Sequence, residues 1–258
     1  MLMLSRRDFL TGTVELPSKE HFHLFLLAGQ SNMAGRGEVE EQDRVADPRV
    51  LSLDTHGQWA PAVDPLHWDK PAIVGVGVGR TFGIQVADRR PEITVGLIPG
   101  AAGGSPIITW EPGGYWEQTD SHPWDDAIRR AKHAMGAGVL KAILWHQGES
   151  DSQEGEAELY EERLHALVRR FRAELNAPDA PFVAGQLGQF PDRPWDEPRR
   201  TVDTAHEALP DNVPNTAFVS SKGLTHKGDG VHFDSASLRE FGRRYAAAYH
   251  ELAEAGAR

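Results

Sequence analysis

The sequence predicts an α/β protein with a central parallel sheet. Short apolar runs alternate with longer segments of helical periodicity along its 258 residues, a pattern typical of βαβ units. The runs are almost continuously apolar, as expected for strands that are buried on both faces. Small and polar residues follow several of these runs, so the loops after the strands are expected to gather at one edge of the sheet.

The strands are predicted from short apolar runs that end in turn residues. The first, Phe22–Leu27, breaks abruptly into small and polar residues that include Gly29 and Ser31. Further strands are expected at Val50–Leu53, Ile93–Ile98, Val139–Trp145, Pro181–Leu187 and Thr216–Ser220.

Helices are predicted where apolar residues recur at spacings of three and four. The segments Glu38–Pro48 and Thr55–Pro71 lack this pattern and are expected to be irregular. Gly138 is expected to cap the C-terminus of the helix predicted at His122–Ala137. The expected helices are Gly75–Arg90, His122–Ala137, Glu156–Leu175, Arg199–Ala208 and Ser235–Ala253.

Composition limits the possible classes of function. A formal net charge of −11 argues against nucleic acid as a partner, because phosphates need a basic face. No apolar run approaches the ~18 residues that span a bilayer, so no membrane partner is expected. The absence of cysteine excludes disulfides, thiol catalysis and cysteine-ligated zinc. No histidine pair with metal-ligand spacing has a third ligand, so neither a metal nor another cofactor is expected.

Residues 1–20 are expected to form a leader and residues 21–258 a single domain, because no repeat or linker interrupts the chain. Within the leader, Ser5–Leu10 (SRRDFL) resembles the start of a twin-arginine export signal. The sequence that follows it, TGTVELPSKE, is too polar for the apolar region of such a signal. Export and a cytoplasmic location therefore both remain open.

Ser31 is the side chain that the turn after the first strand presents. One interpretation is structural, since a serine after a strand commonly caps a helix by accepting a backbone N–H. The other is chemical, because ligands of α/β sheets bind at the carboxyl ends of the strands. Residues further along the chain favour the chemical interpretation.

Four loops at strand ends carry chemically complementary residues. They are Gly29–Gly35 (GQSNMAG), Gly100–Pro106 (GAAGGSP), His146–Asp151 (HQGESD) and Asp229–Asp234 (DGVHFD). A serine nucleophile needs a base to take its proton, and the base needs a carboxylate to orient it. The last loop offers both, with His232 as the base and Asp229 three residues earlier as the carboxylate.

Ester hydrolysis also needs hydrogen-bond donors for the oxyanion that develops on the carbonyl. The backbone N–H of Ser31, a glycine N–H of Gly103 or Gly104, and the side-chain amide of Gln147 are the expected donors. Glycine suits this role because the backbone can approach the substrate without a Cβ in the way.

Substrate contacts are predicted from residues beside these motifs. Gln30 precedes the serine, while Trp110 and Trp116 follow the glycine block. Tryptophan rings can form the wall of a sugar site, although they also pack in cores. Arg36 follows the serine turn closely enough to contact the substrate, but a solvated surface position is the expectation. An acidic cleft lined by aromatic rings would suit a neutral sugar.

Together, GQSNMAG, AAGGSPI, WHQGESD and DGVHFD resemble the motifs of the SGNH-hydrolase superfamily. The resemblance is narrower to its carbohydrate-esterase branch, which includes acetylxylan esterases of carbohydrate esterase family six and sialate O-acetylesterase-like proteins. It covers the chain from about Phe22 to Leu252. It implies a three-layer α/β/α sandwich of the flavodoxin-like type, and metal-free ester hydrolysis by a Ser–His–acid site. Carried over by position, it implies that Ser31 is the nucleophile, His232 the base, Asp229 the acid, and Gly103 or Gly104 an oxyanion donor.

Two residues compete for the role of the acid. Asp229 is favoured by its spacing, because it meets His232 without any tertiary coincidence. Glu149, two residues after Gln147, is the alternative, since triads are defined by geometry and not by sequence position. Gln147 itself stands where the superfamily usually has asparagine.

The sequence therefore predicts a serine esterase that removes acetyl groups from a carbohydrate such as acetylxylan through an acetyl-enzyme intermediate. One alternative is a lipase- or thioesterase-like SGNH hydrolase that acts on short acyl esters. Another is a catalytically inactive relative that binds carbohydrate. Retention of Ser31, His232 and Asp229 together argues against the inactive relative.

Overall fold

A seven-stranded sheet forms the centre of the computed structural model, which describes residues 14–255. The twin-arginine-like Ser5–Leu10 lies outside the described residues. The strand order is β3-β2-β4-β1-β5-β6-β7, and every neighbouring pair is parallel except β2 and β3. The strands are β1 (Phe22–Gly29), β2 (Val50–Leu53), β3 (Trp59–Pro61), β4 (Thr94–Pro99), β5 (Val139–His146), β6 (Phe182–Gly185) and β7 (Thr216–Val219).

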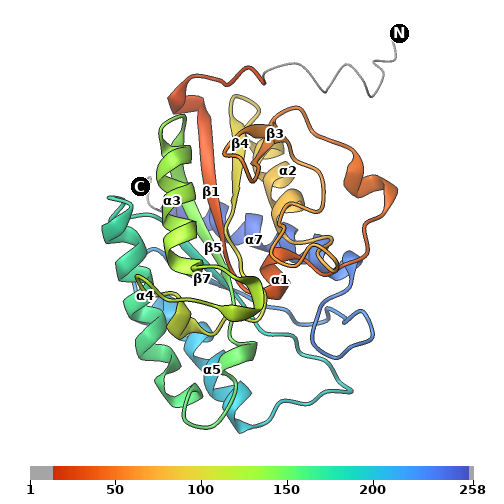
Figure 1. Cartoon of the computed structure of the whole chain (residues 1–258), viewed down its shortest axis with the longest axis vertical. Coiled ribbons are helices and arrows are strands. Elements are labelled where there is room, and N and C mark those ends of the chain that lie inside the picture. The colour runs from red at the N-terminus through yellow and green to blue at the C-terminus, as the bar shows by residue number, and fades with distance from the viewer. Residues whose placement is uncertain (1–13, 256–258) are drawn as a thin grey trace.

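Helices cover both faces of the sheet, so the predicted three-layer α/β/α architecture is confirmed (Figure 1). Helices α3 and α4 lie against one face, and α2 and α7 against the other. The α-helices are α1 (Ser31–Ala34), α2 (Gly79–Arg89), α3 (Pro123–Met135), α4 (Tyr160–Glu174), α5 (Glu197–Glu207), α6 (Leu209–Asn212) and α7 (Ser235–Ala255). The 3-10 helices are η1 (Lys19–His21), η2 (Glu41–Arg44), η3 (Ile107–Thr109), η4 (Glu117–Thr119), η5 (Glu149–Asp151) and η6 (Ala157–Leu159).

Alternating side chains of β1 enter two different cores, which explains why this strand is almost continuously apolar. Phe22, Leu24 and Leu26 pack on the side of α3 and α4. Phe25 and Leu27 point the other way, toward α2 and α7. Successive side chains of a strand face opposite sides of a sheet, so a strand covered on both sides needs apolar residues at most positions.

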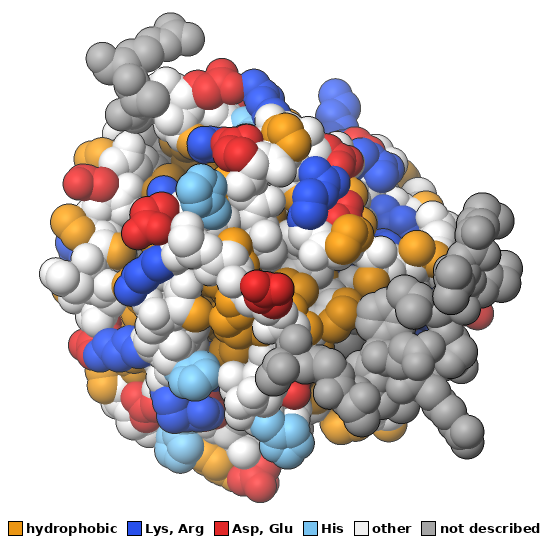
Figure 2. All heavy atoms as spheres, turned by 90° about the horizontal axis from the view of Figure 1, so that it is seen from above, with side chains coloured by type: hydrophobic (Ala, Val, Ile, Leu, Met, Phe, Trp, Pro, Cys, Tyr) orange, Lys and Arg blue, Asp and Glu red, His pale blue; other side chains and the backbone are white. Residues whose placement is uncertain are grey.

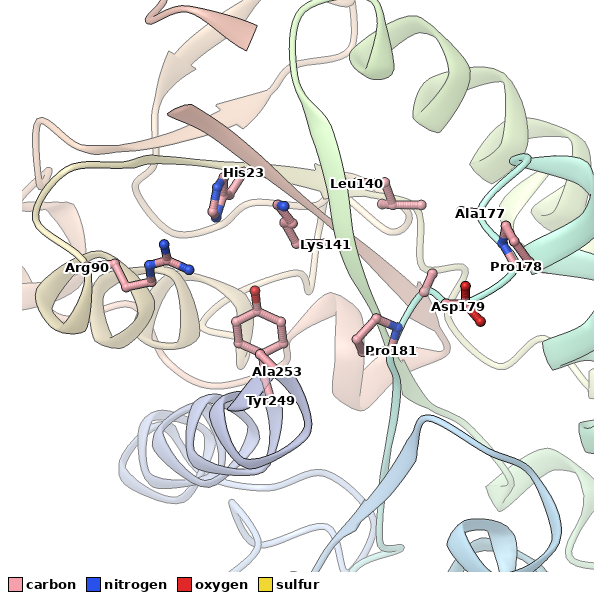
Figure 3. Close-up of a pocket in the computed structure, with 11 residues that line it drawn as sticks. His23, Arg90, Leu140, Lys141, Ala177, Pro178, Asp179, Pro181, Tyr249 and Ala253 are labelled. Carbon is pink, nitrogen blue, oxygen red and sulfur yellow. The ribbon is translucent and has the colours of Figure 1, made fainter. Parts of the chain in front are cut away.

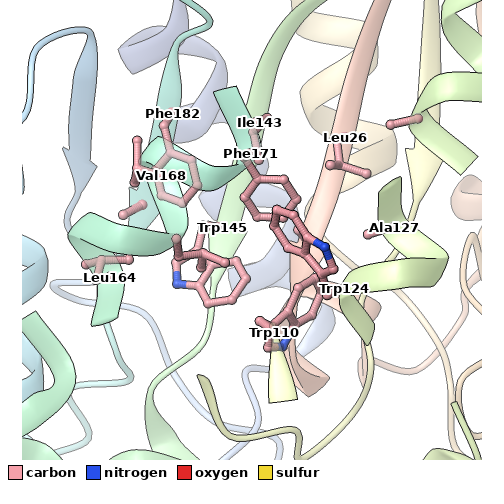
Figure 4. Close-up of a cluster of buried hydrophobic side chains, with 14 of the residues drawn as sticks. Leu26, Trp110, Trp124, Ala127, Ile143, Trp145, Leu164, Val168, Phe171 and Phe182 are labelled. Carbon is pink, nitrogen blue, oxygen red and sulfur yellow. The ribbon is translucent and has the colours of Figure 1, made fainter. Parts of the chain in front are cut away.

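Aromatic rings fill the core between the sheet and helices α3 and α4 (Figure 4). The rings of Trp110 and Trp145 meet edge to face at 5.0 Å. Those of Trp124 and Phe171 lie 4.7 Å apart. Aromatic side chains bury about 150–250 Å² each, so this cluster contributes much of the hydrophobic stabilisation on this face.

The expected elements are present, but several bounds differ from the prediction. Helix α2 starts at Gly79 and not at Gly75, because the N–H groups of Gly75 and Val76 donate to the carbonyls of Gly35 and Gly37. This pairing ties the start of the segment to the loop after α1.

Two further differences concern a cap and a strand. Helix α3 ends at Met135, and its C-cap is Gly136, two residues before the predicted Gly138. The segment Thr55–Pro71, expected to be irregular, contains the short edge strand β3.

The chain changes direction across the sheet at β1. From β1 it proceeds to β2 and β4 on one side, and then crosses to β5 on the other side of β1. Ligands of open α/β sheets bind at the carboxyl ends of strands beside such a switch point. The loops here are tied together, because Gln30 N–H donates to His146 O at 2.8 Å and Ala102 N–H to Gly29 O at 2.9 Å.

The face at the opposite end of the sheet, where β1 begins, shows acidic and basic side chains interspersed with one another (Figure 2). Between residues 14 and 255, none of the helices combines the length and apolar character that crossing a bilayer requires.

Candidate active site

Ser31 is the first residue of α1, directly beyond the carboxyl end of β1. The strand ends at Gly29, where φ is +129° and a Cβ would collide with the carbonyl of His146. This close approach requires glycine. Gln30 is the N-cap of α1, and its side chain makes no capping bond. Ser31 therefore does not serve as the helix cap, and its hydroxyl is directed elsewhere.

The hydroxyl of Ser31 belongs to a chain of three side chains. Its Oγ lies 3.0 Å from His232 Nε2, although 201 residues separate the two in sequence. On the other side of the ring, His232 Nδ1 lies 2.8 Å from Asp229 Oδ2. The structure thus brings the DGVHFD loop to the turn after β1. With its Nδ1–H donated to Asp229, the ring presents the lone pair of Nε2 to Ser31.

Asp229 is held as a carboxylate by its surroundings. Partial burial acts to raise its pKa, but N–H groups outweigh this effect and lower the pKa of Asp229 to about 2. The donors are the backbone N–H of His232 at 2.8 Å, the His232 ring, and the backbone N–H of Val231 at 2.9 Å. The Asp229 side chain stays 36% exposed, so it is a loop carboxylate fixed by local bonds.

Glu149, the alternative acid, occupies a different place. Its Oε1 accepts a hydrogen bond from Asn32 Nδ2 at 2.7 Å and lies 3.9 Å from His146 Nδ1. Its side chain is 8% exposed. Within the described range it makes no hydrogen bond to His232, whereas Asp229 does.

Asn32, which no sequence pattern singled out, joins the serine turn to the histidine loop. Besides Glu149, its Nδ2 donates to the carbonyl of Val231 at 3.2 Å. Its Oδ1 accepts from the N–H of Phe233 at 3.1 Å. These two bonds flank His232, and Asn32 is fully buried. The only signal in the sequence is its place next to Ser31 in GQSNM.

The predicted backbone donors divide into free and occupied groups. Neither the Ser31 N–H nor the Gly104 N–H donates to any residue between 14 and 255, and both residues line the same hollow. Gly104 has a φ of +83°, which favours glycine. The N–H of Gly103 instead donates to Asp69 Oδ2 at 2.8 Å. Of the two predicted glycines, Gly104 is thus the one with an available donor.

Arg36 is buried and not a solvated surface residue as expected. Its Nη2 lies 2.6 Å from Asp69 Oδ2, and the two side chains are 1% and 3% exposed. A Cβ at Gly103 would collide with both partners. Asp69 therefore joins Arg36 to the glycine loop, and this ion pair supports the wall of the site.

Gln147 lies inside the protein and not at the oxyanion position expected of it. Gln147 is fully buried, where its Nε2 donates to Ser105 O and Asp151, and its Oε1 accepts from Tyr160. Its amide thus lies in an internal network away from Ser31, which departs from the expected oxyanion role.

Gln30 takes the place beside Ser31 that was expected of Gln147. Its side chain lines the same hollow as Ser31. Its Oε1 accepts weakly from the Gly148 and Ser150 N–H groups at 3.3 and 3.5 Å. These bonds assign the oxygen to the loop, so the NH₂ group is the end that remains available.

The two predicted substrate-binding tryptophans differ in exposure. Trp110 is fully buried in the aromatic core, and its Nε1 donates to Ser105 Oγ. It cannot touch a substrate, because packing against Trp145 encloses it. Trp116 is half-buried and donates to Gly103 O at 3.1 Å, so it stabilises the glycine loop from outside.

Ser31 and His232 open onto a hollow of about 350 Å³. Its lining includes Lys70 and Arg199 but no Trp, Tyr or Phe side chain of the described residues. Lys70 donates to Gln118, whereas the Arg199 guanidinium forms no ion pair with any residue from 14 to 255. The acidic, aromatic-lined cleft expected from the sequence is not what lines this hollow.

Another hollow, of about 410 Å³, lies at the other end of the sheet (Figure 3). His23, Arg90, Lys141 and Tyr249 surround it, and it contains none of the predicted site residues. Its position near the amino ends of β1 and β5 is the wrong edge for the ligand site of a parallel sheet. Among residues 14–255, no group of three or more His, Asp or Glu side chains forms a metal site.

Comparison with known proteins identifies a family and several related structures. A family model described as carbohydrate esterase, sialic acid-specific acetylesterase, matches residues 21–251. A protein of Arabidopsis thaliana named as a probable carbohydrate esterase is 31% identical over 247 residues, which cover 88% of this chain and 89% of that protein. Its X-ray structure superposes with a TM-score of 0.78 at 29% identity, covering 91% of this chain and 99% of that one.

Two more distant structures share the fold. A carbohydrate acetylesterase from Xanthomonas citri gives a TM-score of 0.69 at 21% identity, over 90% of this chain and 57% of that one. The structure of NanS gives a TM-score of 0.73 at 18% identity, over 93% of this chain and all of that one.

Proposed function

The chain belongs to the carbohydrate esterase family of sialic acid-specific acetylesterases, and we propose that it hydrolyses O-acetyl esters of a glycan through Ser31, His232 and Asp229. Membership confirms the resemblance to the SGNH carbohydrate esterases and makes the chain a carbohydrate acetylesterase, a kind of carboxylic ester hydrolase. The observation that carries the mechanism is the unbroken chain of hydrogen bonds from Ser31 Oγ through His232 to Asp229.

In the first half of the reaction, His232 Nε2 takes the proton of Ser31 as Oγ attacks the acetyl carbonyl carbon. Asp229 stabilises the imidazolium that forms, without itself taking a proton. The tetrahedral intermediate then collapses, the C–O bond to the sugar breaks, and His232 returns the proton to the departing sugar hydroxyl. Ser31 is left as its acetyl ester.

Water completes the cycle. His232 Nε2 takes a proton from a water molecule as its oxygen attacks the acetyl-enzyme carbonyl. The second tetrahedral intermediate collapses, the bond between the carbonyl carbon and Ser31 Oγ breaks, and His232 returns the proton to Oγ as acetic acid leaves and ionises to acetate. The oxyanion of both intermediates is held by the Ser31 and Gly104 N–H groups and by the amide of Gln30. Each preorganised donor of this kind is worth about 3–4 kcal/mol of transition-state stabilisation.

The experiment that tests this function measures acetate released from acetylated xylan, and compares hydrolysis of p-nitrophenyl acetate with that of the butyrate ester. We expect release from the polysaccharide, weak activity on butyrate, and loss of all these activities in Ser31→Ala. Equal or faster turnover of butyrate would support the lipase- or thioesterase-like alternative. Wild-type protein that binds the glycan but hydrolyses none of these esters would be the inactive relative.

A specific observation favours a second candidate substrate, an O-acetylated sugar that carries a carboxylate. Arg199 lines the hollow beside His232 without an anionic partner in the described part of the chain, and a guanidinium matches a carboxylate in a bidentate pair. Sialic acid, which appears in the description of the family, is such a sugar. Arg199→Gln should raise the KM for O-acetylated sialic acid but leave the KM for an acetylated neutral sugar nearly unchanged.

A further inference from the structure

We propose that the enzyme binds a glycan chain and not a single sugar, in a groove that leads from Ser31 along residues 186–200. This inference rests on the proposed esterase function and adds a distal sugar subsite to it. The hollow at Ser31 shares Arg199 with a neighbouring hollow of about 360 Å³. That hollow in turn shares Arg193, Pro194 and Trp195 with one of about 570 Å³. The three hollows thus follow one another along a single segment.

The segment is fixed relative to the proposed base. Asp192 Oδ2 lies 3.0 Å from His226 Nε2, and the ring of Phe190 meets that of His226 edge to face at 4.9 Å. Arg193 packs over Gly230, where a Cβ would lie only 2.6 Å from its Nε. Gly230 is two residues from His232. A sugar bound along this segment would therefore have a defined distance and direction from the reacting ester.

The far hollow offers an aromatic surface of the kind that sugars prefer. Trp195 lines it and is only partly buried, with one side packed against the core. Its Nε1 donates to Gly188 O at 2.7 Å, which fixes the orientation of the ring. A ring held in place beforehand loses little freedom when the C–H face of a sugar packs on it.

Polar groups around this ring match sugar hydroxyls. Asp203 is 4% exposed, and its Oδ2 accepts from Gln186 Nε2 at 2.9 Å. Its Oδ1 is buried without a partner among the described residues, although buried acceptors are normally bonded. Arg193 and Arg200 line the same hollow and form no ion pair within residues 14–255. A sugar hydroxyl can accept from the two exposed arginines, whereas an acyl chain offers them no acceptor.

The volume also suits a saccharide. The hollow of about 570 Å³ lies within the roughly 300–1,000 Å³ range of small-molecule sites. Because the Ser31 hollow is smaller, at about 350 Å³, it would hold the acetylated residue, and the next residues of the chain would lie over Gly230 and Trp195.

A binding experiment on the Ser31→Ala chain tests this inference without relying on turnover. Calorimetry would measure the Kd for O-acetylated xylo-oligosaccharides of one to six residues, and for O-acetylated sialyl-oligosaccharides of increasing length. We expect Kd to fall as the chain lengthens in one of the two series. Adding Trp195→Ala should weaken binding of the longest member by about 3- to 10-fold, as loss of one aromatic contact implies, and Trp195→Phe should restore part of it.

A second variant in the proposed subsite and a control variant outside it complete the test. Arg193→Ala, an exposed change, should also flatten the dependence on length. Arg243→Ala removes an arginine of α7 that pairs with Glu240 and lines none of the three hollows, so it should change nothing. A Kd independent of length in both series, or a length dependence that survives Trp195→Ala and Arg193→Ala, would overturn the subsite. Failure of the esterase function would appear separately, as absent acetate release by the wild-type chain.

Discussion

The side-chain amide of Asn32 donates to Glu149 at 2.7 Å, across 117 residues of sequence. Through its other contacts the same side chain holds Val231 O and Phe233 N–H, on either side of His232. One buried amide thus joins the turn that presents Ser31 to the loop that presents His232, and Glu149 fixes its orientation. Glu149 therefore has a structural role in the site, although among the described residues it makes no hydrogen bond to His232.

The Asn32 contacts predict a loss of kcat without a matching change in KM. In Asn32→Ala the backbone around His232 loses two bonds, and a displacement of about 1 Å can cost about 100-fold in rate. We expect a fall in kcat of about 10- to 100-fold on p-nitrophenyl acetate, with KM within about twofold. Asn212→Ala, on the exposed side of α6, is the matched control. A variant that changes only KM would contradict the positioning role.

The choice between the two acids can be decided by amide substitutions. Asp229→Asn removes the carboxylate beside His232 Nδ1, and we expect a loss in kcat of about 10⁴-fold, by analogy with other triads. Glu149→Gln keeps an acceptor for Asn32 and should cost much less, about tenfold or under. Steady-state kinetics of both variants measure the difference. The reverse order would make Glu149 the acid.

Acid should destabilise the chain partly through Asp229. Its pKa is lowered from the ordinary 3.8 to about 2 in the folded chain, so the unfolded state binds the proton more readily. The resulting stabilisation is present above about pH 4 and is lost as the pH falls toward 2. Urea denaturation between pH 2 and 5 should therefore show a weaker dependence of the unfolding free energy on pH in Asp229→Asn than in wild type. Identical slopes would exclude this contribution.

Alanine substitutions at Gly104 and Gly103 should have different effects, because the Gly104 N–H is a proposed oxyanion donor and Gly103 packs on the ion pair that supports the loop. Gly104→Ala places a Cβ 3.1 Å from the flexible end of Gln118 at a φ of +83°. It should therefore displace the N–H and lower kcat by about 10- to 100-fold. Gly103→Ala drives a Cβ into the buried pair of Arg36 and Asp69, so its main effect should be a lower Tm. Thermal denaturation and kinetics of both variants check this. A Gly104→Ala chain with full activity would remove this N–H from the mechanism.

Alanine substitutions at the two glutamines should change different quantities, stability for Gln147 and kcat for Gln30. Gln147→Ala leaves Ser105 O without its buried donor, whereas Asp151 keeps the Ile107 N–H and Tyr160 keeps His206. A buried group left unsatisfied costs about 1–3 kcal/mol, and the two weakened groups add to this loss. Gln30→Ala removes the amide that faces the hollow and should lower kcat with a smaller change in stability. Urea denaturation and kinetics of the pair test this contrast. An unchanged free energy of unfolding in Gln147→Ala would contradict the internal network.

Sequence patterns predicted the parts of the site that depend on local spacing. Asp229 and His232 are three residues apart in one turn, and Ser31 follows a strand whose apolar run is unmistakable, so their meeting followed from parallel-sheet topology. The same reasoning predicted six of the seven strands. The seventh, β3, is only three residues long and pairs antiparallel at an edge, and no period is visible over so short a length.

The side chains placed incorrectly are those whose direction is decided by packing. Trp110 and Gln147 both stand next to motif residues, yet one fills the aromatic core and the other an internal polar network. Arg36 looked solvated because its partner Asp69 lies 33 residues away. Nothing in the local sequence reports such distant partners. Gly103 and Gly104 are likewise equivalent in sequence and differ only in which N–H meets Asp69.

Covalent labelling tests the central claim that Ser31 is the activated nucleophile. The wild-type chain would be treated with a fluorophosphonate, digested, and mapped by mass spectrometry while residual esterase activity is followed. We predict one label per chain, on the peptide that contains Ser31, with activity lost in proportion and no labelling of His232→Ala. A label on any other serine, or full activity in a chain whose Ser31 is labelled, would contradict the mechanism.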